Sequence, residues 1–310
     1  RKKLTLNHIY YLKDLFLYFK KDYVVIHGHE VENYSDEKFF FVAQSFLIKW
    51  ILNVDIFLSL NVCEKFPLKS KRIYIHHDIS TAPLVDIKNE EQLYKRLIQY
   101  NYIFIPSKKS QTMFKNLFDK YKKKNSEIPK IFCAGYFKLD YLIKKFSKNK
   151  NLKKQIVIAG SDFRHIKKLS ILNNLNKVIK ILLTKTKYRI VFRPYPTNRN
   201  SKQIKNIEKE FANENKFVLD VSDDYYNVYS NSFCMITDIS GTAFTYAFMT
   251  NRPVIFYSEN EKALSELGLS KFGYFKDRKK VGYIAKDIKD LIKNINNIQN
   301  GYNKIKKTNR

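Results

Sequence analysis

The chain has 310 residues, which suggests about two domains at the usual ~100–200 residues each. Hydrophobic residues make up 44% and aromatic residues 15% of the chain, which excludes a disordered protein. Its 58 Lys and Arg residues exceed its 29 Asp and Glu residues, so the formal net charge is +29. Such a field attracts phosphates, anionic lipid surfaces or nucleic acid.

Cysteine is sparse and targeting signals are missing. Three cysteines cannot build a disulfide framework, which favours a reducing compartment. No secretory apolar core follows the first residues, and polar residues interrupt the most apolar stretch, at residues 39–60. We therefore expect a cytoplasmic protein without a membrane span, able to make peripheral contact with the inner face of the plasma membrane.

In the first half of the chain, short β-branched and aromatic runs alternate with amphipathic segments. We predict strands at residues Tyr23–Ile26, Asp55–Leu60, Arg72–Ile75, Tyr102–Ile105 and Lys130–Cys133. We predict helices at Lys38–Ile51, Glu90–Gln99 and Lys108–Lys120, the last capped by Ser107. Strand–helix alternation of this kind is typical of a mostly parallel sheet.

The second half repeats this pattern after a polar, basic segment at residues 146–154. Strands are predicted at residues 155–159, 188–192, 217–219, 233–237 and 253–257, and helices at 166–184, 201–213, 225–231, 241–249 and 287–299. We therefore divide the chain into two α/β domains, at residues 1–148 and 149–299, followed by a basic tail at 300–310. Two α/β domains with a cleft between them suit an enzyme with two substrates.

Ligands of parallel α/β sheets bind beyond the carboxyl ends of the strands, so residues that directly follow strands are candidates. His76, His77 and Asp78 follow one predicted strand. An imidazole titrates near neutrality, so either histidine can take a proton from an attacking hydroxyl, and Asp78 can orient its neighbour. These three are the candidate catalytic residues.

His27, Gly28 and His29 follow the first predicted strand. With Glu30 they resemble a metal site, but residues this close rarely share one tetrahedral ion without distant ligands. We therefore assign His27, Gly28 and His29 to substrate contact, and we expect no metal and no required cofactor.

The second half carries two further candidates. Arg193 ends a strand and precedes two prolines, so its guanidinium is held rigidly and can bind phosphate; Tyr195 lies beside it as a candidate substrate contact. A second group of small and polar residues opens the helix at 241–249, where free N–H groups and the helix dipole favour an anion such as a diphosphate. Its candidate members are Asp238, Ser240, Gly241 and Thr242.

These segments, in this order, resemble the CDP-glycerol glycerophosphotransferase family, the teichoic-acid and capsule polymerases of GT-B fold. The segments that carry the resemblance are 72–76 (RIYIH), 134–142 (AGYFKLDYL), 155–164 (QIVIAGSDFR), 192–196 (FRPYP) and 237–257 (TDISGTAFTYAFMTNRPVIFY). The resemblance implies two Rossmann-like domains facing a central cleft, with the N-terminal domain (1–148) on the acceptor side and the C-terminal domain (149–299) binding the nucleotide donor. It also adds Arg164 to the residues that bind the donor phosphates. The chain departs from the family pattern at His77 (Gly), Tyr195 (His), Gly241 (Ser) and Thr245 (Asp).

The resemblance implies a transferase of bacterial surface-polysaccharide synthesis, for a capsule, a lipooligosaccharide or a teichoic-acid-like polymer. It would move a polyol-phosphate group from a CDP-activated donor to a hydroxyl of a glycan or lipid-linked glycan. His76 would be the base, with His77 as its rival. Two alternatives stay open: a GT-B glycosyltransferase with a nucleotide-sugar donor, which the departures favour, and a non-catalytic nucleic-acid-binding protein, which the charge suggests but no recognition motif supports.

Overall fold

The computed structural model describes residues 25–27, 39–41, 54–60, 62–63, 66–67, 69–79, 90–122, 127–146, 154–163, 167–301 and 305. The chain divides into two compact units, Arg1–Lys138 and Leu139–Arg310, each of which is described by itself. The predicted domain boundary at residues 148 and 149 lies outside the described residues. That boundary therefore stays a prediction.

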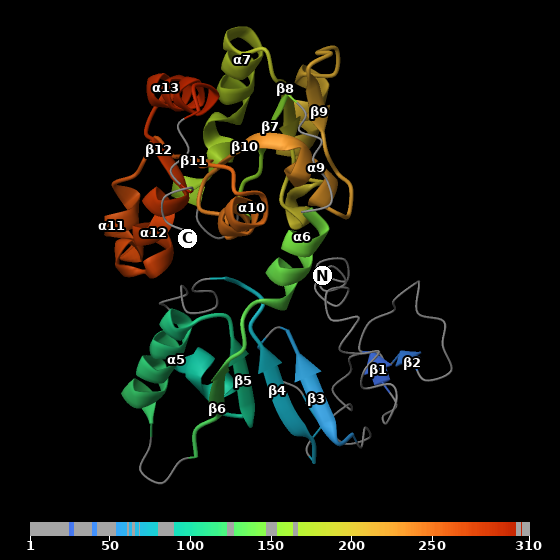
Figure 1. Cartoon of the computed structure of the whole chain (residues 1–310), viewed down its shortest axis with the longest axis vertical. Helices are drawn as coiled ribbons and strands as arrows, with labels where there is room; N and C mark the ends of the chain where they lie inside the picture. Colours follow the sequence, from blue (N-terminus) through green and yellow to red (C-terminus); the bar gives the residue numbers. More distant parts are fainter. Residues whose placement is uncertain are drawn as a thin grey trace. The chain divides into compact units, whose positions relative to one another are not determined.

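The first unit contains a four-stranded parallel sheet in the order β3-β4-β5-β6, drawn as neighbouring arrows in Figure 1. Its strands are β3 (Ile56–Ser59), β4 (Lys71–Ile75), β5 (Tyr102–Ile105) and β6 (Lys130–Cys133). Two helices connect them, α4 (Glu90–Leu97) and α5 (Lys108–Tyr121). The Ser107 side chain accepts a hydrogen bond from the Ser110 N–H, which confirms the predicted cap of α5.

One face of this sheet carries the core of the unit. Tyr74, Ile103 and Ile105 point from the strands into a cluster with Leu97 of α4 and Phe114 of α5. Parallel strands covered by helices read as nearly continuous apolar runs, which is the pattern that the sequence predicted here. The buried face ends at the carboxyl end of β4, where His76 continues the ladder by donating its backbone N–H to the Phe104 carbonyl at 2.8 Å.

The second unit contains a six-stranded parallel sheet in the order β12-β11-β10-β7-β8-β9. Its strands are β7 (Gln155–Ile158), β8 (Arg189–Phe192), β9 (Phe217–Leu219), β10 (Ser232–Thr237), β11 (Val254–Tyr257) and β12 (Gly282–Ala285). The helices are α6 (Phe137–Phe146, which begins in the first unit), α7 (Leu175–Lys185), α8 (Lys202–Glu210), α9 (Tyr226–Asn231), α10 (Thr242–Thr250), α11 (Ala263–Glu266), α12 (Gly273–Val281) and α13 (Ile288–Gln299). The chain runs outward from β7 in one direction and then returns to β10 on its other side. The strand order therefore reverses between β7 and β10.

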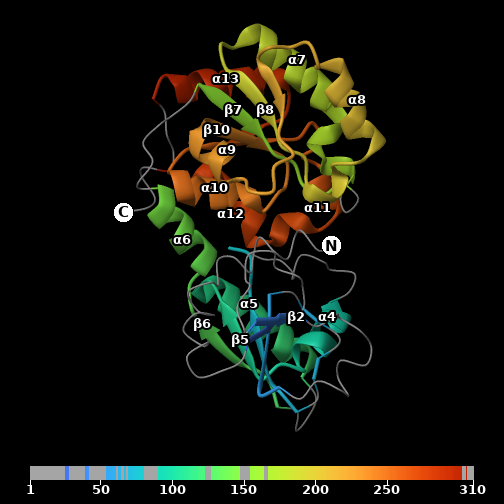
Figure 2. The ribbon, with the colours of Figure 1, turned by 90° about the vertical axis from the view of Figure 1, so that its right-hand side faces the viewer.

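Helices cover both faces of this sheet. Figure 2 shows α7, α8 and α13 on one side and α9, α10 and α12 on the other. The first group packs its apolar stripe on the strands through a continuous cluster that includes Leu182, Ile207 and Leu291. Both predicted halves are therefore α/β with parallel sheets, as expected.

Two helix predictions need correction. Within the predicted helix Lys38–Ile51, residues Phe39–Phe41 form a strand (β2) that pairs in parallel with β1 (Val25–His27). Three consecutive aromatic residues favour extended pairing over a helix, since aromatic side chains have high strand propensity. The rest of that segment lies outside the described residues.

The second correction concerns the predicted helix at 166–184, whose first half is two 3₁₀ turns, Lys167–Leu169 and Ile171–Asn174, before α7 begins. The Ser170 side chain caps the second turn by accepting from the Leu172 N–H. A carboxylate oxygen of Asp238 accepts from the Ile171 N–H at 3.0 Å. These two side-chain acceptors, one local and one distant in the chain, replace α-helical hydrogen bonds and turn the backbone there.

Candidate functional site

The first candidate group lies at the carboxyl end of β4. His76 is 2% exposed and packs its ring edge-on against Phe114, with 5.6 Å between the ring centroids. Its Nδ1 lies 3.1 Å from the Tyr74 hydroxyl, and its Nε2 is buried with no hydrogen-bond partner among the described residues. Burial is the main cause that lowers the pKa of His76 to about 3, with the neighbouring His77 as a smaller cause. His76 is therefore neutral at physiological pH.

His77 is partly exposed and is held by two neighbouring segments. Its Nδ1 lies 2.5 Å from the Leu60 carbonyl oxygen, in the loop that follows β3. Tyr136 donates its hydroxyl to the His77 carbonyl at 2.7 Å. Burial lowers the pKa of His77, and Asp78 opposes that shift because its negative charge favours the protonated ring. The structure thus brings all three candidate catalytic residues to one loop.

The second group lies where β7, β8 and β10 end, at the reversal of strand order. Backbone hydrogen bonds align the three strand ends: Arg193 donates to Ile158, and Ala159 donates to Ile236. Arg193 and Asp238 therefore flank the end of β7 on the same edge of the sheet. Gly160 lies between them, and a β-carbon there would come within 2.9 Å of an Ile171 methyl carbon. The strand-end rule thus placed the donor-side candidates of β8 and β10 correctly relative to each other.

Asp238 is 1% exposed, and its role in this site needs correction. Its carboxylate accepts backbone N–H groups from Ser161 at 2.9 Å, from Ile171 at 3.0 Å and from Ile239 at 2.6 Å. Burial raises the pKa of Asp238, and these hydrogen bonds oppose the shift. A buried carboxylate whose oxygens are already used cannot hold a phosphate, so Asp238 instead fastens the loop after β7 to the end of β10.

Arg193 also differs from the prediction of a guanidinium that is available to phosphate. It is 7% exposed and forms an ion pair with Asp220, which follows β9. It donates further to the Ser222 hydroxyl at 3.1 Å and to the Asp223 carbonyl at 3.3 Å. In this structure Arg193 therefore holds the loop at 220–223 in place.

The opening of α10 is held from both sides by tyrosine hydroxyls. Tyr274 of α12 donates to the Ser240 carbonyl at 2.7 Å, and Tyr229 of α9 shares a 2.8 Å hydrogen bond with the Thr242 hydroxyl. Gly241 is the N-cap residue and provides no side-chain cap. The first N–H groups of a helix have no partner within the helix, so this fixed turn presents donors and the positive end of a dipole.

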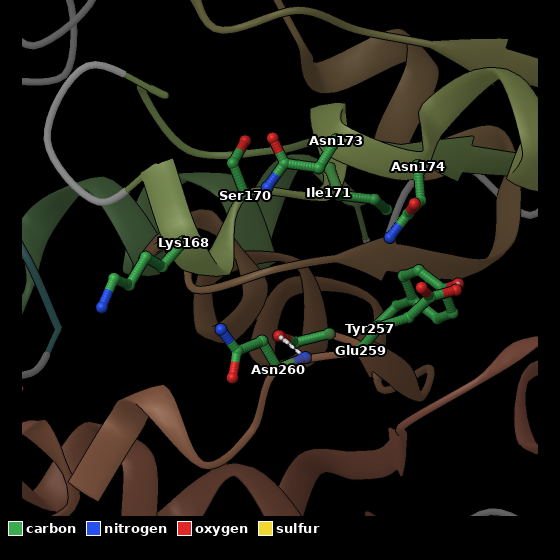
Figure 3. A pocket seen from close by; sticks show the side chains of 9 residues that line it. Lys168, Ser170, Ile171, Asn173, Asn174, Tyr257, Glu259 and Asn260 are labelled. Carbon is green, nitrogen blue, oxygen red and sulfur yellow. Dashed lines mark hydrogen bonds between the residues drawn. The ribbon is translucent and has the colours of Figure 1, made fainter. Parts of the chain in front are cut away.

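A cavity of about 320 Å³ adjoins this edge of the sheet (Figure 3). Ser170, Ile171 and Asn174 line it from one loop, and Ser258 and Asn260 line it from the segment that follows β11. Because the Asp238 carboxylate bonds the Ile171 N–H, the cavity is tied directly to the end of β10. Hydroxyl and amide groups of this kind suit a polar, hydroxylated ligand. No sequence signal pointed to this cavity, because its two walls are far apart in the chain.

Several predicted residues give no side-chain geometry. His27 ends β1, but only its backbone is described, while Gly28, His29 and Arg164 lie outside the described residues. Tyr195 is partly exposed and begins the 3₁₀ turn Pro196–Asn198.

Among the residues that the structure describes, no group of three His, Cys, Asp or Glu side chains is arranged to hold a metal ion. Within the same residues, no helix is long and apolar enough to cross a membrane.

Solved structures with a similar fold include several of the wall teichoic acid polymerase TagF. One variant of that polymerase aligns with a TM-score of 0.63 and 16% identity, over 94% of this chain and 76% of the polymerase chain. A crystal soaked with CDPG aligns with a TM-score of 0.58 and 17% identity, over 96% and 78% of the two chains. Another variant gives a TM-score of 0.54 and 18% identity, over 79% of this chain and 64% of that chain, so this chain spans less than two thirds of that polymerase chain. These similarities confirm the predicted α/β, GT-B-like fold class.

A search among curated proteins gave no match. Residues 71–310 match the protein family described as CDP-glycerol:poly(glycerophosphate) glycerophosphotransferase. This match covers most of the 310 residues and includes both candidate groups. The chain belongs to the CDP-glycerol:poly(glycerophosphate) glycerophosphotransferase family.

Proposed function

We propose that this chain is a transferase of surface-polymer synthesis that moves a polyol-phosphate group from a CDP-activated donor to a hydroxyl of a glycan acceptor. The observation that carries the proposal is the fixed, uncapped start of α10, which lies where the strand order reverses between β7 and β10. Open α/β sheets bind nucleotides at such a reversal, and helix starts bind their phosphates. Membership of the family supports the same donor class.

The donor diphosphate would lie against the turn formed by Ser240, Gly241 and Thr242. The two tyrosine contacts hold that turn before a ligand arrives, so little reorganisation is needed when charge develops on the phosphate oxygens. Arg193 contributes indirectly, because its hydrogen bonds to Ser222 and Asp223 hold the loop at 220–223 in place. Arg164, which follows the loop after β7, remains the proposed direct cationic ligand.

The chemistry needs a base for the acceptor hydroxyl. The loop at 76–78 supplies it, since two imidazoles and a carboxylate follow one strand end there. The acceptor oxygen would attack the donor's distal phosphorus, and cytidine monophosphate would leave. The cavity beside Ile171 would take the hydroxylated head group of the donor.

Donor screening tests the proposal. The full chain is incubated with CDP-glycerol or with UDP-, GDP- and CDP-linked sugars, together with a synthetic glycerol-phosphate oligomer as acceptor. We expect release of CMP from CDP-glycerol and lengthening of the oligomer. Release of a nucleoside diphosphate from a sugar donor would instead support the glycosyltransferase alternative. Salt-sensitive binding to random duplex DNA without any nucleotide binding would support the nucleic-acid alternative.

A matched pair of threonine variants tests the place of binding. Thr242→Val removes the hydroxyl at the start of α10, whereas Thr184→Val removes an exposed hydroxyl of α7 that bonds only to its own helix. Thermal shift with CDP should weaken in the first variant and stay unchanged in the second, because a ligand that binds the folded state raises its apparent stability. Equal shifts in both variants would place the nucleotide elsewhere.

We also propose a cytoplasmic location with peripheral contact to an anionic membrane, on the ground of the +29 net charge. Flotation with vesicles of phosphatidylglycerol and with vesicles of phosphatidylcholine tests this. Binding to the anionic vesicles alone, lost in high salt, is expected. Equal binding to both kinds of vesicle, or to neither, would contradict it.

A further inference from the structure

Glu259 and Asn174 line opposite walls of the cavity beside Ile171, and all residues that line this cavity belong to the second unit (Figure 3). Glu259 follows β11, and Asn174 directly precedes α7. A hydrogen bond from the Asn174 side chain to the Glu259 carboxylate joins the two walls. Asparagine is a favoured N-cap residue, yet Asn174 makes no side-chain cap at the start of α7. Its amide therefore serves the cavity and not its own helix.

Two further groups hold the Glu259 carboxylate in place. The Tyr257 hydroxyl donates to Glu259 Oε1 at 2.6 Å, and Lys177 Nζ of α7 donates to the same oxygen at 3.3 Å. The Tyr257 hydrogen bond is the main cause that lowers the pKa of Glu259, and Lys177 adds to it, so Glu259 is ionised at neutral pH. The Glu259 side chain is 35% exposed, so a ligand can reach it. A carboxylate has about four acceptor positions and can therefore accept from a ligand in addition to these partners.

The charges at the cavity favour a neutral ligand group. Of the described residues that line it, Glu259 is the one acidic side chain and Lys168 the one basic side chain. A carboxylate repels a phosphate group. Its ion pair with Lys177 compensates the negative charge that would attract an ammonium group. A hydroxyl group fits both neighbours, since it can donate to the carboxylate and exchange hydrogen bonds with the amide.

The size and lining of the cavity separate a head group from a nucleobase. Its volume of about 320 Å³ lies at the lower end of the roughly 300–1,000 Å³ that is typical of ligand pockets, so it suits part of a donor and not a whole nucleotide. Nucleobases are commonly bound by stacking on an aromatic face. Tyr257 is the one aromatic residue among the described residues that line the cavity, and at 1% exposure it offers no ring face for stacking.

We propose that this cavity is a vicinal-diol subsite, in which the Glu259 carboxylate accepts a hydrogen bond from one hydroxyl of the donor head group and the Asn174 amide bonds the hydroxyl on the neighbouring carbon. The inference rests on the proposed function, because it takes the ligand to be the head group of the donor. Glu259 and Asn174 are then the residues that determine specificity for the head group. A head group without adjacent hydroxyls leaves one of them without its ligand partner, which weakens binding.

Calorimetric titration of the full chain with two donors tests this specificity. One donor is CDP-glycerol, and the other is its analogue without the central hydroxyl. Because a hydrogen bond to a charged group is lost, the analogue should bind the wild type about tenfold more weakly or worse. In Glu259→Gln the preference should fall to within about threefold, since the amide that replaces one oxygen cannot accept. Equal affinities for the wild type, or an unchanged preference in Glu259→Gln, would overturn the proposal.

Glu210→Gln is the matched control. Glu210 pairs with Lys180 of α7 at 2.6 Å, as Glu259 pairs with Lys177, but Glu210 does not line the cavity. The preference for CDP-glycerol over its analogue should therefore be the same as in the wild type. A preference lost equally in Glu210→Gln and Glu259→Gln would show that neutralising any carboxylate beside α7 is enough, which would overturn the role of Glu259.

Asn174→Ala tests the second residue without changing the charge of the cavity. Because Asn174 makes no helix cap, the substitution removes no capping hydrogen bond from α7. We expect the affinity for CDP-glycerol to fall severalfold and the affinity for CDP, which has no head group, to stay unchanged. An equal loss for both ligands would show that Asn174 acts on the nucleotide or on the fold, and its role in the diol subsite would be overturned.

Saturation-transfer NMR with free glycerol tests the cavity without any nucleotide. We expect transfer from the full chain to glycerol in the wild type and in Glu210→Gln, and its loss in Glu259→Gln. Ethanolamine is the cationic probe, and transfer to it but not to glycerol would overturn the choice of ligand class. Equal transfer to glycerol in the wild type and Glu259→Gln would overturn the site. If the wild type binds no CDP compound, the proposed function fails, and this measurement alone decides whether the cavity binds a vicinal diol.

Discussion

The buried, neutral state of His76 makes the stability of the first unit depend on pH. In the unfolded chain this imidazole has an ordinary pKa of about 6.5, whereas in the folded chain burial lowers its pKa to about 3. Between these two values the unfolded chain binds a proton that the folded chain does not. The contribution of His76 to the free energy of unfolding therefore rises with pH across this window and falls as the solution is acidified.

The size of the effect follows from the two pKa values. One proton of difference changes the free energy of unfolding by about 1.4 kcal/mol per pH unit. Because the window closes near pH 6.5, lowering the pH from 7 to 5 costs about 2 kcal/mol at this one residue. Acidification to below pH 3 would bring the loss to roughly 5 kcal/mol if the unit were still folded.

Urea unfolding at pH 7 and pH 5 measures this loss. Far-ultraviolet circular dichroism of the full chain follows the unfolding. The wild type is compared with the variant His76→Gln, which lacks the titrating ring. Between pH 7 and pH 5 the free energy of unfolding of the variant should fall by about 2 kcal/mol less than that of the wild type. Comparing the two proteins removes the contributions that other groups make to the pH dependence of stability. One such group is Asp238, whose raised pKa makes its contribution change with pH in the opposite direction. Equal losses in both proteins would refute the assignment of His76 as a buried, neutral ring.

Three substitutions in the second unit test how it is built. Gly282→Ala would place a β-carbon 1.9 Å from the Val254 carbonyl oxygen of the paired strand, so we expect roughly 3 kcal/mol of destabilisation in urea unfolding. Asp238→Asn replaces one carboxylate oxygen with an amide NH₂ group, which cannot accept a hydrogen bond from the backbone N–H that it faces. We expect this change to lower the free energy of unfolding by about 1–3 kcal/mol and to weaken the binding of CDP, both measured by calorimetry. Arg193→Lys cannot hold both Asp220 and the loop carbonyl, so CDP affinity should fall severalfold while the melting temperature changes little.

Each of these three results has a matched control. Gly301→Ala adds a β-carbon that meets nothing within 4 Å, so it carries only the backbone strain of a positive φ, about 1–2 kcal/mol, and no clash. Asp287→Asn changes an exposed helix cap and should leave CDP binding unchanged. Unchanged stability in Gly282→Ala would contradict the close pairing of β11 and β12. Unchanged CDP affinity in both Asp238→Asn and Arg193→Lys would separate this edge of the sheet from nucleotide binding.

Much of both sheets could be predicted because their strands appear as uninterrupted apolar runs, as in residues 102–105 and 254–257. The second run is buried along its whole length, and the first alternates buried with partly buried residues. The strand β12 was missed because it begins with Gly282, a residue type that is uncommon in strands. Helix α12 was missed because Arg278 and four other charged residues obscure its apolar positions in the sequence pattern. Arg278 is nevertheless buried, since it pairs with Glu261 through both of its terminal nitrogens. That pairing joins distant segments and leaves no local signal.

The candidate site could likewise be predicted only in part. The strand-end rule placed Arg193 and Ser240 on one edge, because backbone direction alone decides where a parallel strand ends. The rule could not say what each side chain would contact. Asp220 neutralises Arg193, and three backbone N–H groups occupy Asp238. Except for the neighbouring Ile239, these partners come from other strands or loops. Residue type and position therefore predicted where in the fold the candidate site lies. Tertiary contacts decide which of its side chains remain able to bind a ligand.

The same reasoning explains why the groups proposed to meet substrate are held by buried hydroxyls. A hydroxyl can donate and accept, so a tyrosine can fix a neighbouring group without adding a charge that would compete for the substrate's phosphates. Tyr74 does this for His76, and Tyr229 and Tyr274 do it for the start of α10. A lysine or aspartate in these places would shift the field at the phosphates themselves. Removing any one of these hydroxyls should therefore change reactivity or nucleotide affinity more than it changes folding, because each tyrosine ring still fills its place in the core.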